Sequence, residues 1–321
     1  MNILVTGVAG FIGSATAEKL LNLKNTIIGI DDLNDYYDKR IKLYRLEKLK
    51  KYSDFIFLNV DISQRQALDV VFTTYNIDCI VNLAARAGVR YSIENPHIYY
   101  MTNLIGLVNL LELSRQYPIK NLVQASTSSV YAGSPLPFTE DNSVNCPISP
   151  YAASKKSAEV TCYTYHYLYD LNINILRYFT VYGPAGRPDM SIFRFIEQIK
   201  KDVEIVIYGD GAQERDFTYI DDIVAGTIGA LKLEGFNIIN LGNDNPVKLN
   251  SIITLIEKKL HKKAKKVFKD FHKADMEKTW ANINKAKELL KWQPEIDIEK
   301  GINKTVNWHL ENASFLKDIN L

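Results

Sequence analysis

The sequence predicts an α/β fold, a doubly wound parallel sheet joined to a smaller, discontinuous α/β domain. The first observation is a short apolar strand, Asn2 to Thr6, that runs into a glycine-rich loop and then into a helix. The second is that strand and helix patterns alternate over more than half of the 321 residues, as in sheets covered by helices on both faces. The third is that this alternation breaks after Val181, where loops and lysine-rich helices follow.

The loop after the first strand has glycines where a dinucleotide-binding turn requires them. Gly7 permits a tight turn, Gly10 lets a bulky anion approach the backbone, and Gly13 lets the helix pack closely on the strand. The helix offers free N–H groups and a positive dipole end to a pyrophosphate. The next strand ends in Asp31 and Asp32, about 20 residues on, where an acid binds a ribose hydroxyl. We therefore expect a Rossmann-type site for NAD, since paired acids would repel the 2′-phosphate of NADP.

The other elements follow from apolar runs for strands and from helical spacing of apolar residues for helices. The expected strands of the main sheet are 2–6, 26–30, 55–59, 79–83, 121–126, 173–178 and 236–241. The expected helices between them are 15–23, 36–51, 64–75, 96–115, 151–169 and 220–231. Ser63 is the expected N-cap of the helix that ends at Tyr75.

The later part of the chain predicts the second domain. We expect a helix at 191–200, a strand at 205–208 and helices at 249–260, 283–290 and 298–310, with no sheet pattern after residue 244. The strand at 236–241 is apolar enough to return to the main sheet. The expected division is a cofactor domain of 1–181 with about 216–243, and a substrate domain of about 182–215 and 244–321. The second would lie over the carboxyl edge of the sheet, where such folds bind ligands.

Composition and charge are those of an ordinary globular protein, with 46% hydrophobic residues, 24% charged residues and a net charge of +2. This balance argues against nucleic-acid or membrane-surface partners, and the basic run at 258–266 is interpreted as a solvated helix face and exit loop. Cys79, Cys146 and Cys162 have neither disulfide nor metal-ligand spacing, so no metal is expected. With no signal peptide and no apolar run of membrane-spanning length, the expected location is the cytoplasm.

Hydroxyl and basic side chains form the expected catalytic group. The sequence Ser-Thr-Ser-Ser at 126–129 follows a predicted strand, so these hydroxyls should face the cleft. Tyr151 and Lys155 are one helical turn apart, on the same face of the next helix. A phenol is a poor base at neutral pH, but a neighbouring ammonium and an oxidised nicotinamide favour its phenolate. The order of glycine loop, hydroxyl cluster and Tyr-x-x-x-Lys therefore predicts a dehydrogenase-like site.

These motifs together resemble the extended short-chain dehydrogenase/reductase family over nearly the whole chain. The residues that carry the resemblance are Gly7-x-x-Gly10-x-x-Gly13, Asp31, Asp61-Ile62, Asn82-Leu83-Ala84-Ala85, Ser126-Thr127-Ser128, Tyr151-x-x-x-Lys155, Leu176-Arg177-Tyr178, Arg215-Asp216-Phe217 and Ala286-x-x-Leu289-Leu290-x-Trp292-x-Pro294. The more specific segments 32–38, 87–92, 179–184 and 186–190 are similar to family members that invert C4 of UDP-glucuronate.

The resemblance implies a role for individual residues. Residues expected along NAD are Gly7, Gly10, Phe11, Ile12, Gly13, Asp31, Asp32, Asp61, Ile62, Leu83, Ala84 and Ala85, with Tyr151, Lys155 and Tyr178 at the nicotinamide end. Thr127 matches the catalytic Ser/Thr of the family, Tyr151 its base and Lys155 its ligand to the cofactor ribose. Thr180 and Arg215 match positions near the nucleotide-sugar phosphates, and Asp275 matches a uridine-ribose ligand.

The implied activity is NAD-dependent 4-epimerisation of UDP-glucuronate to UDP-galacturonate through a 4-keto sugar, with NAD retained. A 4-epimerase of UDP-glucose or another neutral UDP-hexose is one alternative, and a UDP-glucuronate decarboxylase is another. Decarboxylases and dehydratases of the family carry an acid within the segment that is Thr-Ser-Ser at 127–129 here, which favours epimerisation. A non-catalytic dinucleotide-binding protein is the alternative from another class, but Tyr151 and Lys155 are both present.

A uronate substrate adds a requirement, because its 4-keto form is a β-keto acid that can lose carbon dioxide. The carboxylate must therefore be held out of alignment with the carbonyl π-system. The hydroxyls expected to hold it belong to Thr127, Ser128, Ser129 and Thr180, and the possible charge partners are Arg187 and Arg90.

Three departures from the family pattern stand out. Ala132 replaces a glycine, Ala-Asp-Met at 274–276 replaces Gly-Asp-Val, and Arg86 replaces a commoner glutamine. Arg86 is the one that bears on sugar contacts.

Two helices have more apolar surface than one sheet face can cover. In helix 96–115, Ile98, Met101, Ile105 and Val108 form one stripe and Leu104, Leu107 and Leu111 another. In helix 151–169, Cys162, Tyr165 and Tyr169 lie apart from Val160, Tyr163 and Tyr167. We expect a homodimer through a four-helix bundle, with burial beneath loops as the alternative.

Overall fold

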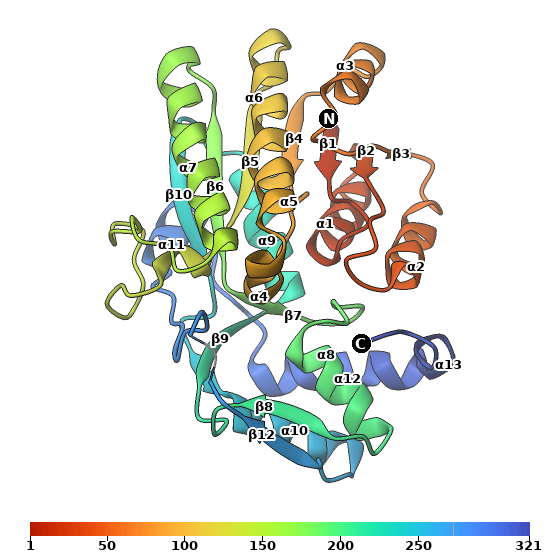
Figure 1. The fold of residues 1–321 in the computed structure, drawn as a ribbon. Helices are drawn as coiled ribbons and strands as arrows, with labels where there is room; N and C mark the ends of the chain where they lie inside the picture. Colours follow the sequence, from red (N-terminus) through yellow and green to blue (C-terminus); the bar gives the residue numbers. More distant parts are fainter. Residues whose placement is uncertain (272) are drawn as a thin grey trace.

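The computed structural model describes residues 1–271 and 273–321, and its centre is a sheet of seven parallel strands (Figure 1). In spatial order the strands are β10 (Phe236–Leu241), β6 (Ile173–Tyr178), β5 (Asn121–Thr127), β4 (Cys79–Asn82), β1 (Asn2–Thr6), β2 (Thr26–Asp31) and β3 (Phe55–Asn59). Every neighbouring pair is parallel. The strand order reverses between β1 and β4, and ligands of doubly wound sheets bind at such a point.

Helices cover both faces of this sheet, which confirms the predicted fold class. One face packs against α3 (Arg65–Thr74), α6 (Gly106–Gln116) and α7 (Pro150–Tyr169), and the other against α1 (Phe11–Asn22), α2 (Lys39–Leu49) and α9 (Ile220–Ala230). Successive side chains of β1 alternate between these two cores, Leu4 in the first and Ile3 and Val5 in the second. All three are fully buried, so both faces of the strand are apolar.

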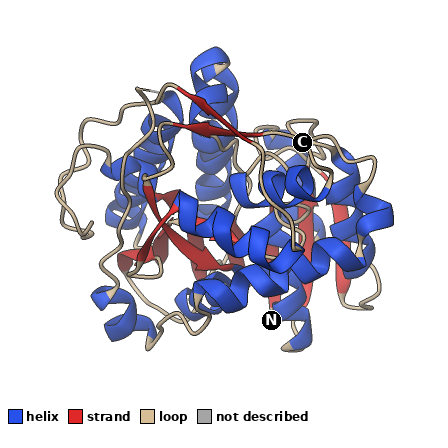
Figure 2. Cartoon of the chain, turned by 90° about the horizontal axis from the view of Figure 1, so that it is seen from below, coloured by secondary structure: helices blue, strands red, loops and turns tan. Residues whose placement is uncertain are grey.

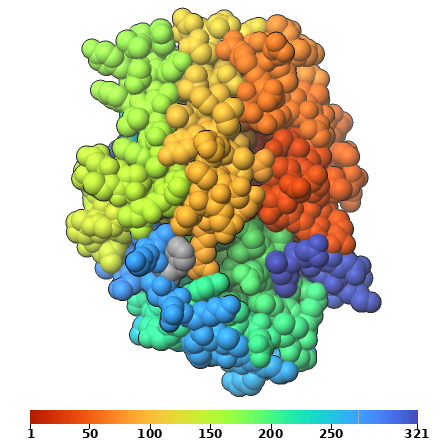
Figure 3. Space-filling view, viewed as in Figure 1, coloured from red at the N-terminus to blue at the C-terminus, as the bar shows by residue number. Residues whose placement is uncertain are grey.

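A smaller region lies at the carboxyl edge of the sheet (Figures 1 and 2). It contains a three-stranded sheet of β7 (Thr180–Tyr182), β9 (Glu214–Tyr219) and β11 (Pro246–Lys248), and a parallel pair of β8 (Ile205–Tyr208) and β12 (Lys266–Lys269). Its helices are α8 (Ser191–Lys200), α10 (Leu249–Leu260) and α12 (Ile298–Glu311), whose apolar faces share one core. The end of the chain, with α13 (Ala313–Leu316), packs against α8, and in Figure 3 it is the dark blue segment beside green residues.

The structure corrects several expected elements. Helix 96–115 is three segments, α5 (Pro96–Tyr100), a π-helical turn η1 (Met101–Ile105) and α6, and Gln64 rather than Ser63 is the N-cap of α3. The expectation of no sheet after residue 244 is wrong, since β11 and β12 both pair there. These strands are short and largely exposed, so they lack the apolar run that marks a buried strand. Other segments without a predicted counterpart are α4 (Val89–Glu94), the 3-10 turn η2 (Ser128–Tyr131), β7 and β9.

The return to the main sheet at 236–241 is confirmed, because β10 pairs with β6 along its whole length. The last helices, including α11 (Asn284–Leu290), lie within a residue of their expected bounds. In the part of the chain that the structure describes, no helix is both long enough and apolar enough to span a bilayer.

Candidate active site

The loop between β1 and α1 has no room for a side chain at any of its three glycines, and a Cβ on Gly10 would lie 2.9 Å from the Gly7 carbonyl oxygen. Gly7 has a φ of +65°, and a Cβ there would lie 2.7 Å from the backbone nitrogen of Ala84 at the end of β4. A Cβ on Gly13 would lie 2.1 Å from the Gly7 carbonyl oxygen. The turn is therefore packed backbone against backbone, and α1 begins at Gly10 without a side-chain cap. Its first N–H groups are left for an anion, as in a pyrophosphate site.

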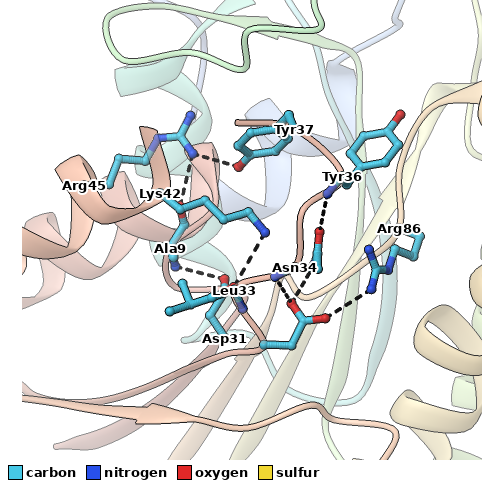
Figure 4. A network of polar contacts seen from close by, with 10 residues as sticks. Ala9, Asp31, Leu33, Asn34, Tyr36, Tyr37, Lys42, Arg45 and Arg86 are labelled. Carbon is cyan, nitrogen blue, oxygen red and sulfur yellow. Dashed lines mark hydrogen bonds and ion pairs between the residues drawn. The ribbon is translucent and has the colours of Figure 1, made fainter. Parts of the chain in front are cut away.

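The acid pair after β2 lies beside this loop, and each carboxylate has a cation as neighbour (Figure 4). Asp31 accepts hydrogen bonds from the backbone of Ala9 at 3.1 Å and Leu33 at 2.9 Å, and lies 3.9 Å from the buried ammonium of Lys42. Burial raises the pKa of Asp31, and the charge of Lys42 opposes that rise. Asp32 pairs with Arg86 at 3.2 Å.

The positions of Lys42 and Arg86 modify two expectations that came from the sequence. Arg86 contacts an acid of the expected cofactor site, so its side chain belongs to that end of the cleft rather than to sugar contacts. Asn103 fixes the backbone of Arg86 by accepting from its N–H at 2.8 Å and donating to its carbonyl at 3.0 Å. The paired carboxylates thus face two cations, and repulsion of a 2′-phosphate is weaker than the sequence alone suggests.

The remaining expected cofactor residues also border this edge of the sheet. Thr6 accepts hydrogen bonds from the backbone N–H groups of Leu83 and Ala84, at 3.1 and 3.0 Å, while it donates to Asn82. Ile62 is buried in the core beneath α6, and Tyr178 turns its hydroxyl to Thr227 on α9 at 2.9 Å. The other residues expected along the cofactor are Phe11 and Ile12 in the first turn of α1, Asp61, which accepts from the N–H of Ser63 at 2.8 Å, and Ala85 after β4.

The predicted catalytic residues converge at the end of β5. Thr127 accepts a hydrogen bond from the backbone N–H of Ser129 at 3.1 Å and donates to its hydroxyl at 3.2 Å, which caps the turn η2. Tyr151, in the first turn of α7, hydrogen bonds with Thr127. Ser149 caps α7, and Pro150 at its first position fits the helix start, so the phenol is fixed at the cleft.

The charges that act on Tyr151 differ from those expected from the sequence. Burial raises the pKa of Tyr151, while the Thr127 hydrogen bond and the charge of Arg187 oppose that rise. Arg187, and not Lys155 as expected, is the protein cation that lowers the Tyr151 pKa here. Burial also lowers the pKa of Lys155 to about 8, with Glu159 opposing, so its ammonium is retained at neutral pH.

A buried ion pair supports these residues from behind. Arg177 on β6 binds both carboxylate oxygens of Glu159 on α7, at 2.9 and 2.8 Å, and also donates to the hydroxyl of Tyr131 at 2.7 Å. Ser126 donates to Glu159 at 2.6 Å. The network ties β5, β6 and α7 together directly below Thr127.

Arg187 comes from the loop after β7 and lies in an aromatic setting. It binds Asp189 through two hydrogen bonds, at 3.0 and 2.6 Å, and its guanidinium lies 5.6 Å from the ring centre of Tyr36. A pocket here is lined by Phe11, Thr180 and Arg187 among others, so residues of both regions border one space. Ser128, next to Thr127, is buried.

A second group of expected substrate residues lies across the cleft. Arg90 on α4 pairs with Asp275 at 2.6 Å, and its guanidinium stacks 3.7 Å above the ring of Tyr208 on β8. Arg215 donates to the carbonyl groups of Glu214 and Glu277, and Asp275 opposes the lowering of its pKa by burial. The expected residues therefore form two groups, Arg187 beside Tyr151, and Arg90 with Asp275 and Arg215.

Sequence reasoning gave no role to several residues that shape the site. Asp189 and Tyr36 lie within segments that carry the family resemblance, which was the only available signal for them. Lys42 and Arg45 are buried charges on a helix with a polar composition, and nothing in the local pattern distinguishes them from solvated residues.

Comparison with known proteins places this fold and site in a family. The family described as GDP-mannose 4,6 dehydratase matches residues 4–305. The chain belongs to this family. The resemblance to extended short-chain dehydrogenase/reductases predicted from its motifs is thereby confirmed.

Within the family, the chain is 56% identical over 317 residues to a UDP-glucuronate 4-epimerase of Thermodesulfobacterium geofontis, with 98% of both chains covered. It superposes with a TM-score of 0.91 on the UDP-glucuronic acid 4-epimerase of Bacillus cereus in complex with UDP-glucuronic acid and NAD, at 36% identity over 97% of this chain and 99% of that one. A UDP-glucose 4-epimerase of Thermotoga maritima with UDP-glucose gives 0.89, at 30% identity over 98% and 100% of the chains.

Proposed function

We propose that this protein is an NAD-dependent 4-epimerase that interconverts UDP-glucuronate and UDP-galacturonate through a 4-keto sugar. The observation that carries the proposal is the half-buried Tyr151 in the first turn of α7, whose phenol hydrogen bonds with Thr127 and is affected by the charge of Arg187. A phenol that acts as a base, close to a guanidinium that binds anions, is suited to a sugar that carries a carboxylate. The 56% identity to an enzyme of this name supports the same activity.

NAD fits the residues present. The glycine turn leaves a cradle that side chains would fill, the start of α1 leaves N–H groups for the pyrophosphate, and Asp31 offers its carboxylate to a ribose. Lys155 lies one turn below Tyr151, where it would meet the nicotinamide ribose. Bound there, NAD supplies the acceptor and donor of the sugar C4 hydride.

The protein's own part in the reaction is proton transfer and orientation. Tyr151 takes the proton from the sugar 4-hydroxyl and returns it after the keto sugar has turned over in the cleft. Thr127 fixes the phenol through its hydrogen bond, and the charge of Arg187 favours the phenolate form. No net oxidation results, so the cofactor should remain bound between turnovers.

Control of the carboxylate distinguishes this substrate from a neutral sugar. We assign the carboxylate to Arg187 rather than Arg90, because Arg187 lines one pocket with Thr180, a hydroxyl residue expected to hold the carboxylate, and its charge acts on Tyr151. Arg90 lies with Asp275 and Tyr208, beside Arg215, and these residues suit the uridine and phosphates. The hydroxyls of Ser128, Ser129 and Thr180 would complete the carboxylate site. Held there, the carboxylate stays out of line with the 4-keto group and carbon dioxide is not lost.

Three wider features belong to the proposal. The division into a cofactor domain of 1–181 with about 216–243 and a nucleotide-sugar domain of about 182–215 and 244–321 is the first, and each group of side chains combines residues of both domains. The protein would act in the cytoplasm, supplying a uronate for polysaccharide assembly. It would act as a homodimer, since α7 exposes Val160, Tyr163 and Tyr167, and η1 exposes Met101 and Ile105.

One incubation tests the activity. Purified protein is given UDP-glucuronate deuterated at C4, without added cofactor, and the products are separated. We expect UDP-galacturonate that keeps the deuterium and little pentose. Deuterium lost to solvent would contradict the hydride mechanism, dominant UDP-xylose or UDP-arabinose would indicate a decarboxylase, and faster turnover of UDP-glucose would indicate a neutral-sugar epimerase.

A further inference from the structure

Arg45, on α2, is a buried arginine whose partners are all carbonyl or phenol oxygens. Its side chain is almost wholly enclosed, with 3% of the residue exposed. Five hydrogen bonds leave its three nitrogens, at 2.8 to 3.0 Å, to the carbonyls of Ala9, Ala185 and Gly186 and to the hydroxyl of Tyr37. Five is the number of N–H donors that a guanidinium has.

No described carboxylate forms an ion pair with Arg45. A buried charge without a counter-ion is stable only when its donors are satisfied. Here three carbonyl groups, the Tyr37 hydroxyl and the faces of Tyr37 and Phe11, 5.7 and 5.9 Å from the guanidinium, provide that compensation. If any of these segments moved away, the cation would lose a partner that water could not easily replace. The arrangement therefore links the positions of the segments to one another.

The segments that Arg45 joins come from the two halves of the site. Ala9 belongs to the glycine loop, and Figure 4 shows the Arg45 guanidinium between its carbonyl and the Tyr37 hydroxyl. Ala185 and Gly186 belong to the loop after β7 and directly precede Arg187. One guanidinium thus spans from the expected pyrophosphate loop to the residue beside Arg187, which lines a pocket together with Phe11 and Thr180.

The substrate side of this link is held in a strained conformation. Ala185 has a φ of +53°, which an alanine adopts only at a free-energy cost. Its carbonyl accepts two of the five hydrogen bonds, at 3.0 and 2.8 Å. The conformation of Ala185 sets the direction of the backbone that leads to Arg187, and the hydrogen bonds from Arg45 hold that conformation.

We propose that Arg45 is a positioning residue that fixes Arg187 against the cofactor loop, and so keeps the uronate carboxylate out of line with the 4-keto group. The inference rests on the proposed function and extends it to a residue that touches neither substrate nor reacting atoms. A planar fork is needed, because a lysine ammonium cannot reach acceptors on three segments at once.

The test is the substitution Arg45→Lys, which keeps the charge and removes the fork. We expect the fraction of UDP-pentose among the products to rise and the KM for UDP-glucuronate to rise about tenfold, the effect of one lost charge-assisted hydrogen bond. The dissociation constant of UDP, which has no carboxylate, should stay within about twofold, since its expected ligands lie across the cleft. A change of fold stability alone would not alter the ratio of pentose to hexuronate.

Two further variants make the result decisive. Arg65→Lys changes a half-buried arginine of α3 that pairs with Asp69, on the opposite face of the sheet from α2, and should leave the product ratio unchanged. Tyr37→Phe keeps the ring and removes one acceptor of Arg45, so the pentose fraction should rise less than in Arg45→Lys. If Arg45→Lys does not fold, Tyr37→Phe carries the test.

An unchanged pentose fraction in the folded variant would overturn the role of Arg45 while leaving the epimerase proposal intact. Absence of epimerisation by the unmodified protein would instead overturn the proposed function, on which the role depends.

Discussion

At the scale of single residues, Tyr151 lies where its ionisation is opposed by burial and favoured by few neighbours. Its pKa is raised by burial in the free protein, and Thr127 and Arg187 offset only part of that effect. The positive charge of the oxidised cofactor, arriving next to the phenol, is the natural source of the remaining shift.

We expect Tyr151→Phe to lower kcat about 10²- to 10⁴-fold, the contribution of a positioned general base. The substitution removes only the hydroxyl, so the affinity for UDP and the amount of NAD released on denaturation should stay unchanged. Steady-state kinetics and titration with UDP measure the two quantities. Activity within about threefold of the original enzyme would remove Tyr151 from the mechanism.

At the scale of secondary-structure elements, buried polar pairs fix the register of helices against the sheet. The pair Arg177 and Glu159 joins β6 to α7, and burial of each charge is tolerated because the other is present. The pair His309 and Glu197 joins α12 to α8 at 2.8 Å, and both residues are fully buried. These pairs set where α7 and α8 present their first turns to the cleft.

Arg177→Met should lower the free energy of unfolding by about 3–5 kcal/mol, because Glu159 is then buried without its main partner. Adding Glu159→Leu should recover part of that loss, since the unpaired charge is removed as well. Urea titration followed by circular dichroism measures both variants. Equal stabilities of the single and double variants would show that the pair acts through packing alone.

The His309 pair predicts a dependence of stability on pH. Burial lowers the pKa of His309, with Glu197 opposing, so the folded protein keeps the imidazole neutral at pH values where the unfolded chain protonates it. Unfolding then takes up a proton below about pH 6.5, and stability falls as the pH falls, by at most about 1.4 kcal/mol per pH unit for this group.

We expect His309→Gln to reduce the loss of stability between pH 7 and pH 5. The glutamine amide can still donate to Glu197 but does not titrate. His97 is exposed, so His97→Gln serves as the control and should keep the pH dependence of the original protein. The free energy of unfolding is measured for the three proteins between pH 7 and pH 5. Identical slopes of this free energy against pH would refute the assignment of the effect to His309.

At the scale of the whole molecule, α6 and α7 lie side by side on one face of the sheet and turn an outer face away from it (Figure 1). The stripe with Leu107 and Leu111 and the face with Cys162 pack inward. The opposite face of α7 exposes Val160, Tyr163 and Tyr167, at 50%, 53% and 74% of their surface. Met101 and Ile105 are exposed on the neighbouring turn η1, and such a cluster of exposed large apolar residues is typical of a subunit interface.

We expect light scattering at micromolar concentration to give about twice the chain mass of 36.6 kDa. Val160→Asp should give the monomer mass, because it places a charge at the expected helix contact. Val70→Asp, at a valine of α3 that is even more exposed than Val160, should leave the dimer intact. A monomer mass for the unmodified protein would refute the four-helix interface.

The sequence by itself determined the sheet, the family and the order of hydroxyl, tyrosine and lysine on which the proposed mechanism depends. Those properties depend on local patterns, such as an apolar strand that leads into a glycine turn, or two side chains one helical turn apart. The sequence did not predict the short strands β11 and β12, because pairing with a neighbouring strand, rather than composition, makes them strands.

Only the tertiary structure decided which charges meet. Arg45 and Ala185 are 140 residues apart in the chain, Arg90 and Asp275 are 185 apart, and Arg86 and Asp32 are 54 apart. Each pair forms where separate loops reach the same edge of the sheet, and no local pattern encodes that meeting. The proposal of Arg187 rather than Arg90 as the carboxylate partner therefore depends on how the chain folds, because a charge acts over ångströms in space and not over positions in a sequence.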